Sequence, residues 1–287
     1  MSPFLRRLPV PVAPFPTQTV TSYVTRLALA NHLKPATLAD YLRGPGTTRR
    51  RPDPGHLTAA TGMSRLVLQQ ALPELDPHRL SPQHGCSRLA CRFWAAARGI
   101  YSPVRCWAMG YPGVCLRHRR WTGPTVLNVE GQIDLSRVPE VLGAAKRHYR
   151  LVPEHGLLRA RCAYQDALDV TLGWARRGWW GRHRDRRLRR LSAAPVVLIG
   201  DPALHAALYP ETVSLACILA SPHWVGAAVS ADRADRGRFY SEVARRLDLS
   251  EYRPAAVGDP LACWVAREAR LAFAEVPPGF RSNVWRR

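Results

Sequence analysis

The segment from Cys86 to His118 constrains the fold most, because it holds four cysteines and one histidine within 33 residues. Structural zinc sites are tetrahedral and take four cysteine or histidine ligands, commonly as two closely spaced pairs. Cys115 and His118 form a C-x-x-H pair, whereas Cys86 and Cys91 are separated by four residues. We therefore predict a structural Zn²⁺ site in which Cys86, Cys91, Cys115 and His118 occupy all four positions.

Two features of this segment leave its ligand set open. Cys106 and His84 are further residues of the right type, and either is able to replace one of the four. Trp94 stands where a C-x-x-C pair that starts at Cys91 would place its second cysteine. The alternative is therefore a remnant in which the indole fills a lost metal position. In both cases we expect a small zinc-finger-like module over residues 79–125.

The chain before this module has the pattern of an arm followed by helical hairpins. The first sixteen residues contain five prolines, which predicts an extended arm, and residues 17–22 offer hydroxyl groups that cap a helix. Further on, residues 56–75 read HLTAATGMSRLVLQQALPEL, with apolar residues at helical spacing on both sides of a glycine. The pattern predicts a helix-turn-helix in an N-terminal domain over residues 1–78.

The turn of this helix-turn-helix needs particular residues. Gly62 is expected to take the left-handed conformation between the helices, and Ser64 to cap the second helix. Leu57 and Leu68 are expected to pack the two helices together. A hairpin whose second helix packs inward, or contacts another protein, is the alternative, because that helix is rather apolar.

Basic residues outnumber acidic residues by 42 to 21, which leaves a formal net charge of +21. A polyanion is the natural partner, since each phosphate that a cation neutralises releases condensed counterions. The densest positive charge lies in residues 176–190, which hold eight arginines beside Trp179 and Trp180. We predict phosphate contacts there, and the alternative is a solvated basic helix whose tryptophans pack on the domain beneath. The residues that we expect to contact DNA are Arg65, Gln69 and Gln70 of the helix-turn-helix, together with Arg119, Arg120, Arg182, Arg186, Arg187, Arg189 and Arg190.

The remainder of the chain has helical periodicity, so we predict a mainly α fold with a basic helical C-terminal domain over residues 126–287. Ser136 is a plausible cap for its first helix, and Asp201, Ser230 and Asp259 for later ones. Cys162, Cys217 and Cys263 lie in apolar helical contexts, which favours core packing.

Several classes of protein lack support in the sequence. The N-terminal residues are broken by prolines and have no apolar signal region, and no run of about 18 apolar residues occurs, so we expect a cytoplasmic protein without a membrane anchor. No nucleotide-binding loop, metalloprotease helix or hydrolase elbow is present, and the scarce acidic residues form no Mg²⁺-binding pattern. We therefore expect no enzymatic activity.

The order of these parts resembles the TniQ family. Its members open with a proline-led segment of the form L-P-x-P-x-P-x-E-S-x-x-S-W-x-x-R-L-A, continue through a helix-turn-helix, and close the recognisable region with C-x-x-H. In this chain residues 17–28 keep Ser22 and the R-L-A triplet, whereas Gln18 stands at the position of the acid and Tyr23 at that of the tryptophan. The resemblance covers roughly residues 8–125.

The resemblance implies a role in DNA transposition. A TniQ-like protein is a target-selection adaptor that links target DNA to an AAA+ ATPase regulator and a transposase, and performs no chemistry itself. The implied partners are double-stranded DNA, the ATPase and the transposase, and a homodimer is left open. The alternative is a helix-turn-helix transcription regulator that reads an operator without transposition partners.

Overall fold

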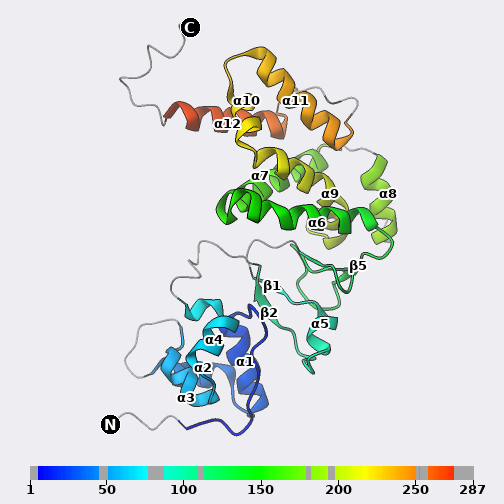
Figure 1. Ribbon diagram of the computed structural model, residues 1–287. Helices are drawn as coiled ribbons and strands as arrows, with labels where there is room; N and C mark the ends of the chain where they lie inside the picture. Colours follow the sequence, from blue (N-terminus) through cyan, green and yellow to red (C-terminus); the bar gives the residue numbers. More distant parts are fainter. Residues whose placement is uncertain are drawn as a thin grey trace. The chain divides into compact units, whose positions relative to one another are not determined.

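The computed structural model describes residues 6–44, 51–76, 87–108, 113–178, 182–192, 198–249, 252 and 258–274. The described chain is mainly helical, as predicted, and forms two compact units, Met1–Gln132 and Ile133–Arg287 (Figure 1). The segments expected to form the N-terminal domain, 1–78, and the Cys/His module, 79–125, both lie within the first unit.

Four short helices form the first core of unit 1. They are α1 (Val20–Ala30), α2 (Pro35–Arg43), α3 (Pro54–Thr61) and α4 (Arg65–Ala71), followed by the 3-10 turn η1 (Pro73–Leu75). Side-chain caps fix where the helices begin: Thr19 accepts from the Ser22 amide at α1, and Asp53 accepts from two amides at α3. Buried side chains such as Tyr23, Leu27 and Leu57 join the helices into one apolar cluster.

The turn between α3 and α4 has the predicted local structure. Gly62 is left-handed, with φ of 69°, and its amide donates to the Thr58 carbonyl, which ends α3. The Ser64 side chain accepts from the Val67 amide and starts α4. Leu57 and Leu68 are both buried. These local predictions are therefore confirmed.

The second core of unit 1 joins the N-terminal arm to the cysteine-rich segment. The elements of that segment are β1 (Ser87–Leu89), α5 (Arg92–Ala96), β2 (Arg105–Trp107), β3 (Val114–Cys115) and β4 (Arg120–Trp121). Strands β1 and β2 pair antiparallel, as do β3 and β4. Phe15 of the arm is fully buried among Ala95, Val104 and Cys106. The Glu74 carboxylate accepts hydrogen bonds from both the Val20 amide and the Trp107 indole. These two hydrogen bonds connect α1 to β2.

Unit 2 begins with β5 (Ile133–Asp134) and is otherwise helical in its described residues. Its helices are α6 (Pro139–His155), α7 (Leu157–Arg176), α8 (Arg182–Leu191), α9 (Pro202–Leu219), α10 (Pro222–Val229), α11 (Arg233–Leu247) and α12 (Pro260–Ala274). Helix α9 is buried on most sides and packs against α6, α7 and α8 (Figure 1). The expected cap at Asp201 is present, because its carboxylate accepts from the Ala203 amide. Asp259 likewise accepts from the Leu261 amide at α12.

Some expectations for unit 2 are wrong. Helix α6 starts at Pro139 without a side-chain cap, and the Ser136 amide instead donates to the Asp134 carboxylate in the preceding turn. Ser136 is therefore a turn residue. Cys162 and Cys263 are exposed, whereas Cys217 is half-buried. Of these three cysteines, Cys217 packs against the core.

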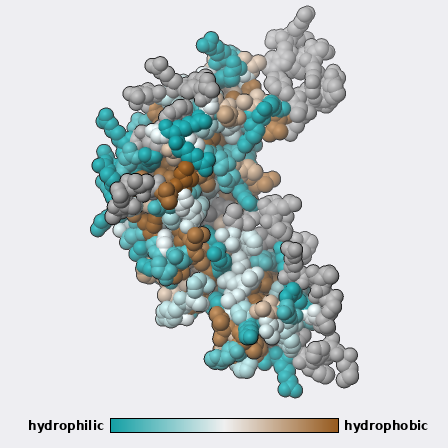
Figure 2. All heavy atoms as spheres, turned by 180° about the vertical axis from the view of Figure 1, so that it is seen from behind, coloured by the Kyte–Doolittle hydropathy of each residue, from teal (hydrophilic) through white to brown (hydrophobic). Residues whose placement is uncertain are grey.

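The surface is mixed in character. On the face drawn in Figure 2, hydrophobic side chains form separate small patches among hydrophilic ones. Among the described helices none has both the length and the apolarity to cross a membrane alone. The one adjoining pair that reaches both together, α9 with α10, is bent by 81°.

Candidate metal centre and nucleic-acid interface

Three of the four predicted zinc ligands lie together. The sulfur atoms of Cys91 and Cys115 and a ring nitrogen of His118 all lie within 4.8 Å of one another. The Nδ1 atom of His118 is 3.6 Å from the Cys91 sulfur and 3.5 Å from the Cys115 sulfur. The fourth predicted ligand, Cys86, and the alternative ligand His84 lie outside the described residues.

Local structure places each ligand. Cys91 precedes the first turn of α5, where its carbonyl accepts from the Ala95 amide. Cys115 ends β3, and His118 lies in the four-residue turn that leads into β4. The turn closes tightly because Arg119 takes a positive φ of 50°. A C-x-x-H spacing thus brings a sulfur and a nitrogen to the same side of one hairpin turn.

Gln132 holds the Cys91 ligand from behind. Its side-chain oxygen accepts from the Arg92 amide at 3.0 Å, and its side-chain nitrogen donates to the Ala90 carbonyl at 2.8 Å. Both partners are the chain neighbours of Cys91, and the Gln132 side chain is buried. The two hydrogen bonds therefore fix the backbone that carries the ligand.

The spacing of the three donors fits a tetrahedral metal ion. With Zn–S near ~2.3 Å and Zn–N near ~2.0 Å, a sulfur and a nitrogen at two corners of the tetrahedron are about 3.6 Å apart. The two sulfur–nitrogen distances at His118 match this value. Two cysteines and one histidine are also the soft and borderline donors that zinc prefers. These three residues could therefore hold a metal ion.

The two sulfurs shift each other's pKa. A hydrogen bond from the Cys91 thiol lowers the pKa of Cys115, and the same bond, helped by burial, raises the pKa of Cys91. The thiolate is the form of cysteine that binds metals, so Cys115 is the sulfur that gives up its proton more readily to a cation. Binding of a cation would release protons from the pair.

Cys106 and Trp94, which left the ligand set open, contact other residues. Cys106 is buried in β2 beside Phe15, and burial raises the pKa of its thiol to about 11. The Trp94 ring meets the Phe15 ring edge-on at a centroid separation of 4.6 Å, with the Arg98 guanidinium over its face. Trp94 thus belongs to the arm core and does not fill the space between the three ligands.

Arg119 and Arg120, which we expected to contact DNA, have different surroundings. Arg119 is exposed at the tip of the turn. The Arg120 guanidinium lies 5.0 Å from the centre of the Phe93 ring, and the Arg92 guanidinium lies 4.9 Å from the same centre. The Phe93 ring in turn lies 5.8 Å from the His118 ring. Arg120 is therefore half-buried and packs beside the Cys91, Cys115 and His118 cluster, whereas Arg119 is the more accessible cation.

Helix α4 presents a mixed face to solvent. Arg65 and Gln70 are exposed, as are Leu66 and Val67. The Gln69 side chain is half-buried and donates to the Leu75 carbonyl at 3.3 Å. Of the three residues predicted to read DNA on this helix, Gln69 is thus held by its own domain.

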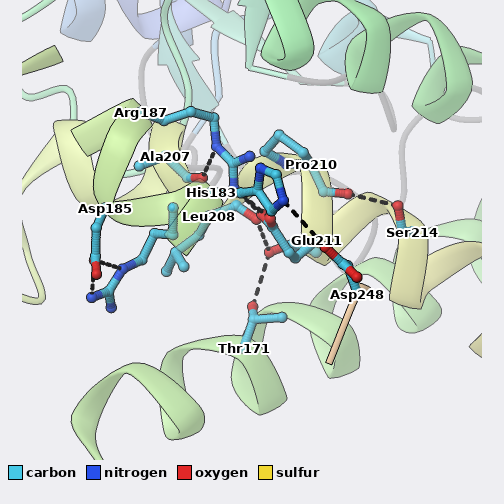
Figure 3. A network of polar contacts seen from close by, with 12 residues as sticks. Thr171, His183, Asp185, Arg187, Ala207, Leu208, Pro210, Glu211, Ser214 and Asp248 are labelled. Atoms are coloured by element: carbon cyan, nitrogen blue, oxygen red, sulfur yellow. Dashed lines mark hydrogen bonds and ion pairs between the residues drawn. The ribbon is translucent and has the colours of Figure 1, made fainter. Parts of the chain in front are cut away.

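Helix α8 separates its arginines into two groups. Arg182, Arg186, Arg189 and Arg190 are exposed, whereas Arg187 is only 4% exposed. The Arg187 guanidinium donates to the Ala207 carbonyl at 2.8 Å and pairs with the Glu211 carboxylate, both on α9 (Figure 3). Arg187, which we expected to contact DNA, is therefore buried in this structure with its donors bound to α9. Trp179 and Trp180 lie outside the described residues.

The exposed arginines of α8 keep their charge available. Within the described residues, none of Arg182, Arg186, Arg189 and Arg190 forms an ion pair. Arg189 and Arg190 make only long contacts of 3.4 Å to the backbone carbonyls of Asp185 and Arg137. The helix's one acid, Asp185, pairs with Arg184 instead.

Comparison with known proteins gives no relative. No family model, curated protein or solved structure matches this chain. The resemblance to TniQ therefore stays a prediction from the residues that carry it.

Sequence reasoning missed the residues that support these sites. Gln132 and Glu211 are single polar residues without any motif, and their partners lie far away in the sequence. Neither residue has a local sequence signal that indicates its partner.

Proposed function

We propose that this chain is a DNA-binding protein that acts as a TniQ-like adaptor for target-site selection in transposition. The observation that carries the DNA-binding part is the exposed arginine face of α8. Positions 182, 186, 189 and 190 follow helical spacing, so their side chains share one side of the helix. The Arg187–Glu211 pair attaches a neighbouring side of the helix to α9.

This arrangement suits phosphate binding for a physical reason. Guanidinium groups bind phosphate oxygens in a fork and release condensed counterions from the duplex. A helix held to its domain by a buried ion pair presents those groups without having to fold on binding. The net charge of +21 supplies the long-range attraction that brings a duplex to the surface.

The α3–Gly62–α4 pair supports the proposal as a second DNA contact. Its second helix begins at a serine cap after a left-handed glycine, and it exposes Arg65 and Gln70. A helix with this entry is the element that helix-turn-helix proteins place in the major groove. The Cys91, Cys115 and His118 cluster would hold a structural zinc ion that fixes the β3–β4 turn and takes no part in chemistry.

The test of DNA binding compares two quadruple variants of the full chain. Changing Arg182, Arg186, Arg189 and Arg190 to alanine removes the proposed phosphate contacts. The matched control changes Arg233, Arg238, Arg245 and Arg246 of α11 to alanine, which removes the same charge from the same unit. Three of these four control arginines already pair with acids on α11.

The readout is the slope of log affinity against log salt for a labelled mixed-sequence duplex. Each lost phosphate contact lowers that slope by about 0.9, so the α8 variant is expected to lose up to ~3.6 and the control much less. Equal slopes for the wild type and the α8 variant would contradict the proposal.

The adaptor part has its own experiment. A tagged chain is purified from native lysate after nuclease treatment, so that DNA cannot bridge proteins, and the bound proteins are identified by mass spectrometry. An AAA+ ATPase or a transposase in the eluate supports the adaptor. A chain that binds one DNA site tightly and retains neither partner is instead a transcription regulator.

A further inference from the structure

The N-terminal arm is pinned across the helices of unit 1. The Leu8 amide donates to the Ala60 carbonyl of α3 at 2.8 Å. Val10 and Asn31 exchange two hydrogen bonds, one from the Val10 amide at 2.8 Å and one from the Asn31 side chain to the Val10 carbonyl at 2.9 Å. The buried Tyr23 hydroxyl donates to the Val12 carbonyl at 2.9 Å. Successive arm residues are thus bound to α3 and α1.

The start of the arm lies on the α3–α4 turn. A Cβ atom on Gly62 would fall 2.7 Å from the Nε atom of Arg7, so the Arg7 guanidinium lies directly against this glycine. A side chain at this position would be strained by the positive φ and would have to displace the Arg7 side chain. The turn that starts α4 is therefore also the seat of the arm.

Three exposed arginines belong to the arm and to α4, and Arg7 is the one that lies against Gly62. Arg6 and Arg7 come from the arm, and Arg65 is the first residue of α4. Within the described part of the chain none of them has an ion-pair partner. The nearby helices offer few carboxylates: Asp40 pairs with Arg43, Asp53 caps α3, and Glu74 accepts from Val20 and Trp107.

We propose that the arm, residues 6–13, binds nucleic acid together with the α3–α4 pair. Arg6 and Arg7 of the arm bind backbone phosphates of the same duplex that α4 faces. This inference deepens the proposed function and rests on it. The arm's hydrogen bonds hold it in place before binding, so the contact costs less ordering entropy than a free tail would.

The chemistry of the contact is that of phosphate recognition. Guanidinium groups from the arm and from the start of α4 provide forked donors for phosphate oxygens. Phosphate contacts fix the position of a protein on the duplex and carry no sequence information. Loss of the arm's charge is therefore expected to weaken binding to all duplexes by a similar factor.

The experiment uses the full chain and a labelled mixed-sequence duplex over a range of salt. The double variant R6A/R7A is expected to lower the log–log salt slope by about 1 to 2, since each phosphate contact contributes about 0.9. The charge-preserving variant R6K/R7K is expected to keep the wild-type slope. A matched control, K34A/R105A, removes two exposed cations from the same unit and is expected to leave the slope close to that of the wild type.

The outcomes separate this inference from the proposed function. If the wild type binds the duplex and R6A/R7A has the wild-type slope, the arm contact is overturned while DNA binding stands. If R6A/R7A and K34A/R105A lower the slope equally, the effect is one of net charge, and the arm contact is again overturned. If the wild type binds no duplex, the proposed function fails first. The melting temperature of R6A/R7A is expected to equal that of the wild type, because both side chains are exposed.

Discussion

Cys115 is the residue on which the metal site depends most directly. A hydrogen bond from the Cys91 thiol lowers its pKa, and the sulfurs of Cys91 and Cys115 lie 3.6 Å and 3.5 Å from one ring nitrogen of His118. A site with this donor set is expected to take one zinc ion per chain and to couple metal binding to the folding of unit 1.

Replacing this thiolate tests the site. Cys115→Ser is expected to remove most bound zinc, because a hydroxyl is a poor zinc ligand in place of a thiolate. The measurement is zinc content per chain by elemental analysis after dialysis. The control is Cys162→Ser, which changes an exposed cysteine on α7. A Cys115→Ser chain that retains a full equivalent of zinc would show that the metal, if bound, lies elsewhere.

Gly113 meets the most severe steric limit among the described glycines. A Cβ atom there would fall 2.0 Å from the Cα atom of Gly123, because the two glycines lie close together beside the β3–β4 pair. Gly113→Ala is expected to destabilise the fold by about 1 to 3 kcal/mol, because the obstacle is backbone and cannot rotate away. The measurement is urea unfolding.

A second glycine provides the matched control. Gly143 lies inside α6, and a Cβ atom there meets nothing within 4 Å. Gly143→Ala is expected to stabilise the fold by up to about 1 kcal/mol through helix propensity. Similar effects of the two substitutions on the free energy of unfolding would contradict the close approach of Gly113 and Gly123.

His148 makes the stability of unit 2 depend on pH. Burial lowers the pKa of His148 to about 4, and its ring stacks on Tyr164 and bonds the Tyr209 hydroxyl at 2.9 Å. The unfolded chain, with an ordinary histidine pKa near ~6.5, binds this proton more readily. The contribution is therefore complete above about pH 6.5 and is lost as the pH falls towards 4, by roughly 3 kcal/mol.

A variant isolates this contribution from other titrating groups. His148→Gln keeps a polar partner for Tyr209 but does not titrate. The free energy of unfolding of the wild type is expected to fall more steeply than that of the variant between pH 6.5 and 4. Parallel curves in this window would mean that His148 is not buried as the structure has it.

At the residue scale, the sequence predicted the clustered cysteine and histidine residues better than the residues that hold their backbone in place. The C-x-x-H spacing identifies Cys115 and His118 because the two lie in one turn. Gln132 had no such signal, since its partners Ala90 and Arg92 lie 42 and 40 positions away and are bound through their backbone. Contacts of this kind depend on the fold and leave no local pattern.

At the scale of elements, the sequence predicted α3 and α4 well because their signals are local. A glycine with positive φ and a serine cap specify the turn wherever the pair packs. The start of α6 was wrong, because Asp134 binds the Ser136 amide and Pro139 provides a preferred first helical residue. Competing caps within a few residues are decided by tertiary packing.

Helix α8 illustrates the same limit. Its sequence shows an arginine-rich face, but only the fold reveals that Glu211 of α9 claims Arg187 (Figure 3). Arg187→Ala is expected to destabilise unit 2 by about 3 kcal/mol, because a carboxylate and a carbonyl lose their buried partner. Hydrogen exchange of the α8 amides is expected to become faster.

A double variant checks the origin of that loss. Arg187→Met with Glu211→Gln removes both charges and keeps similar volumes, so it is expected to recover much of the stability. If Arg187→Ala leaves both stability and exchange unchanged, the ion pair does not hold α8 on α9. The exposed arginines of the helix would then need another support.

At the scale of the whole molecule, the charge balance predicted a polyanionic partner but not where it binds. Each unit carries its own exposed arginines without acidic partners among the described residues, at the α3–α4 turn in the first and on α8 in the second. Composition alone cannot distinguish these from Arg120 and Arg187, which are engaged within the protein. The fold decides which charges remain available.

The salt dependence of duplex binding by the wild-type chain is the most direct test of DNA binding. We expect the logarithm of the affinity to fall linearly with log salt, with a slope of several units that reflects contacts from both units. We also expect similar slopes for duplexes of unrelated sequence. Absence of binding at ~50 mM salt, or a slope close to zero, would contradict DNA binding as the function of this protein.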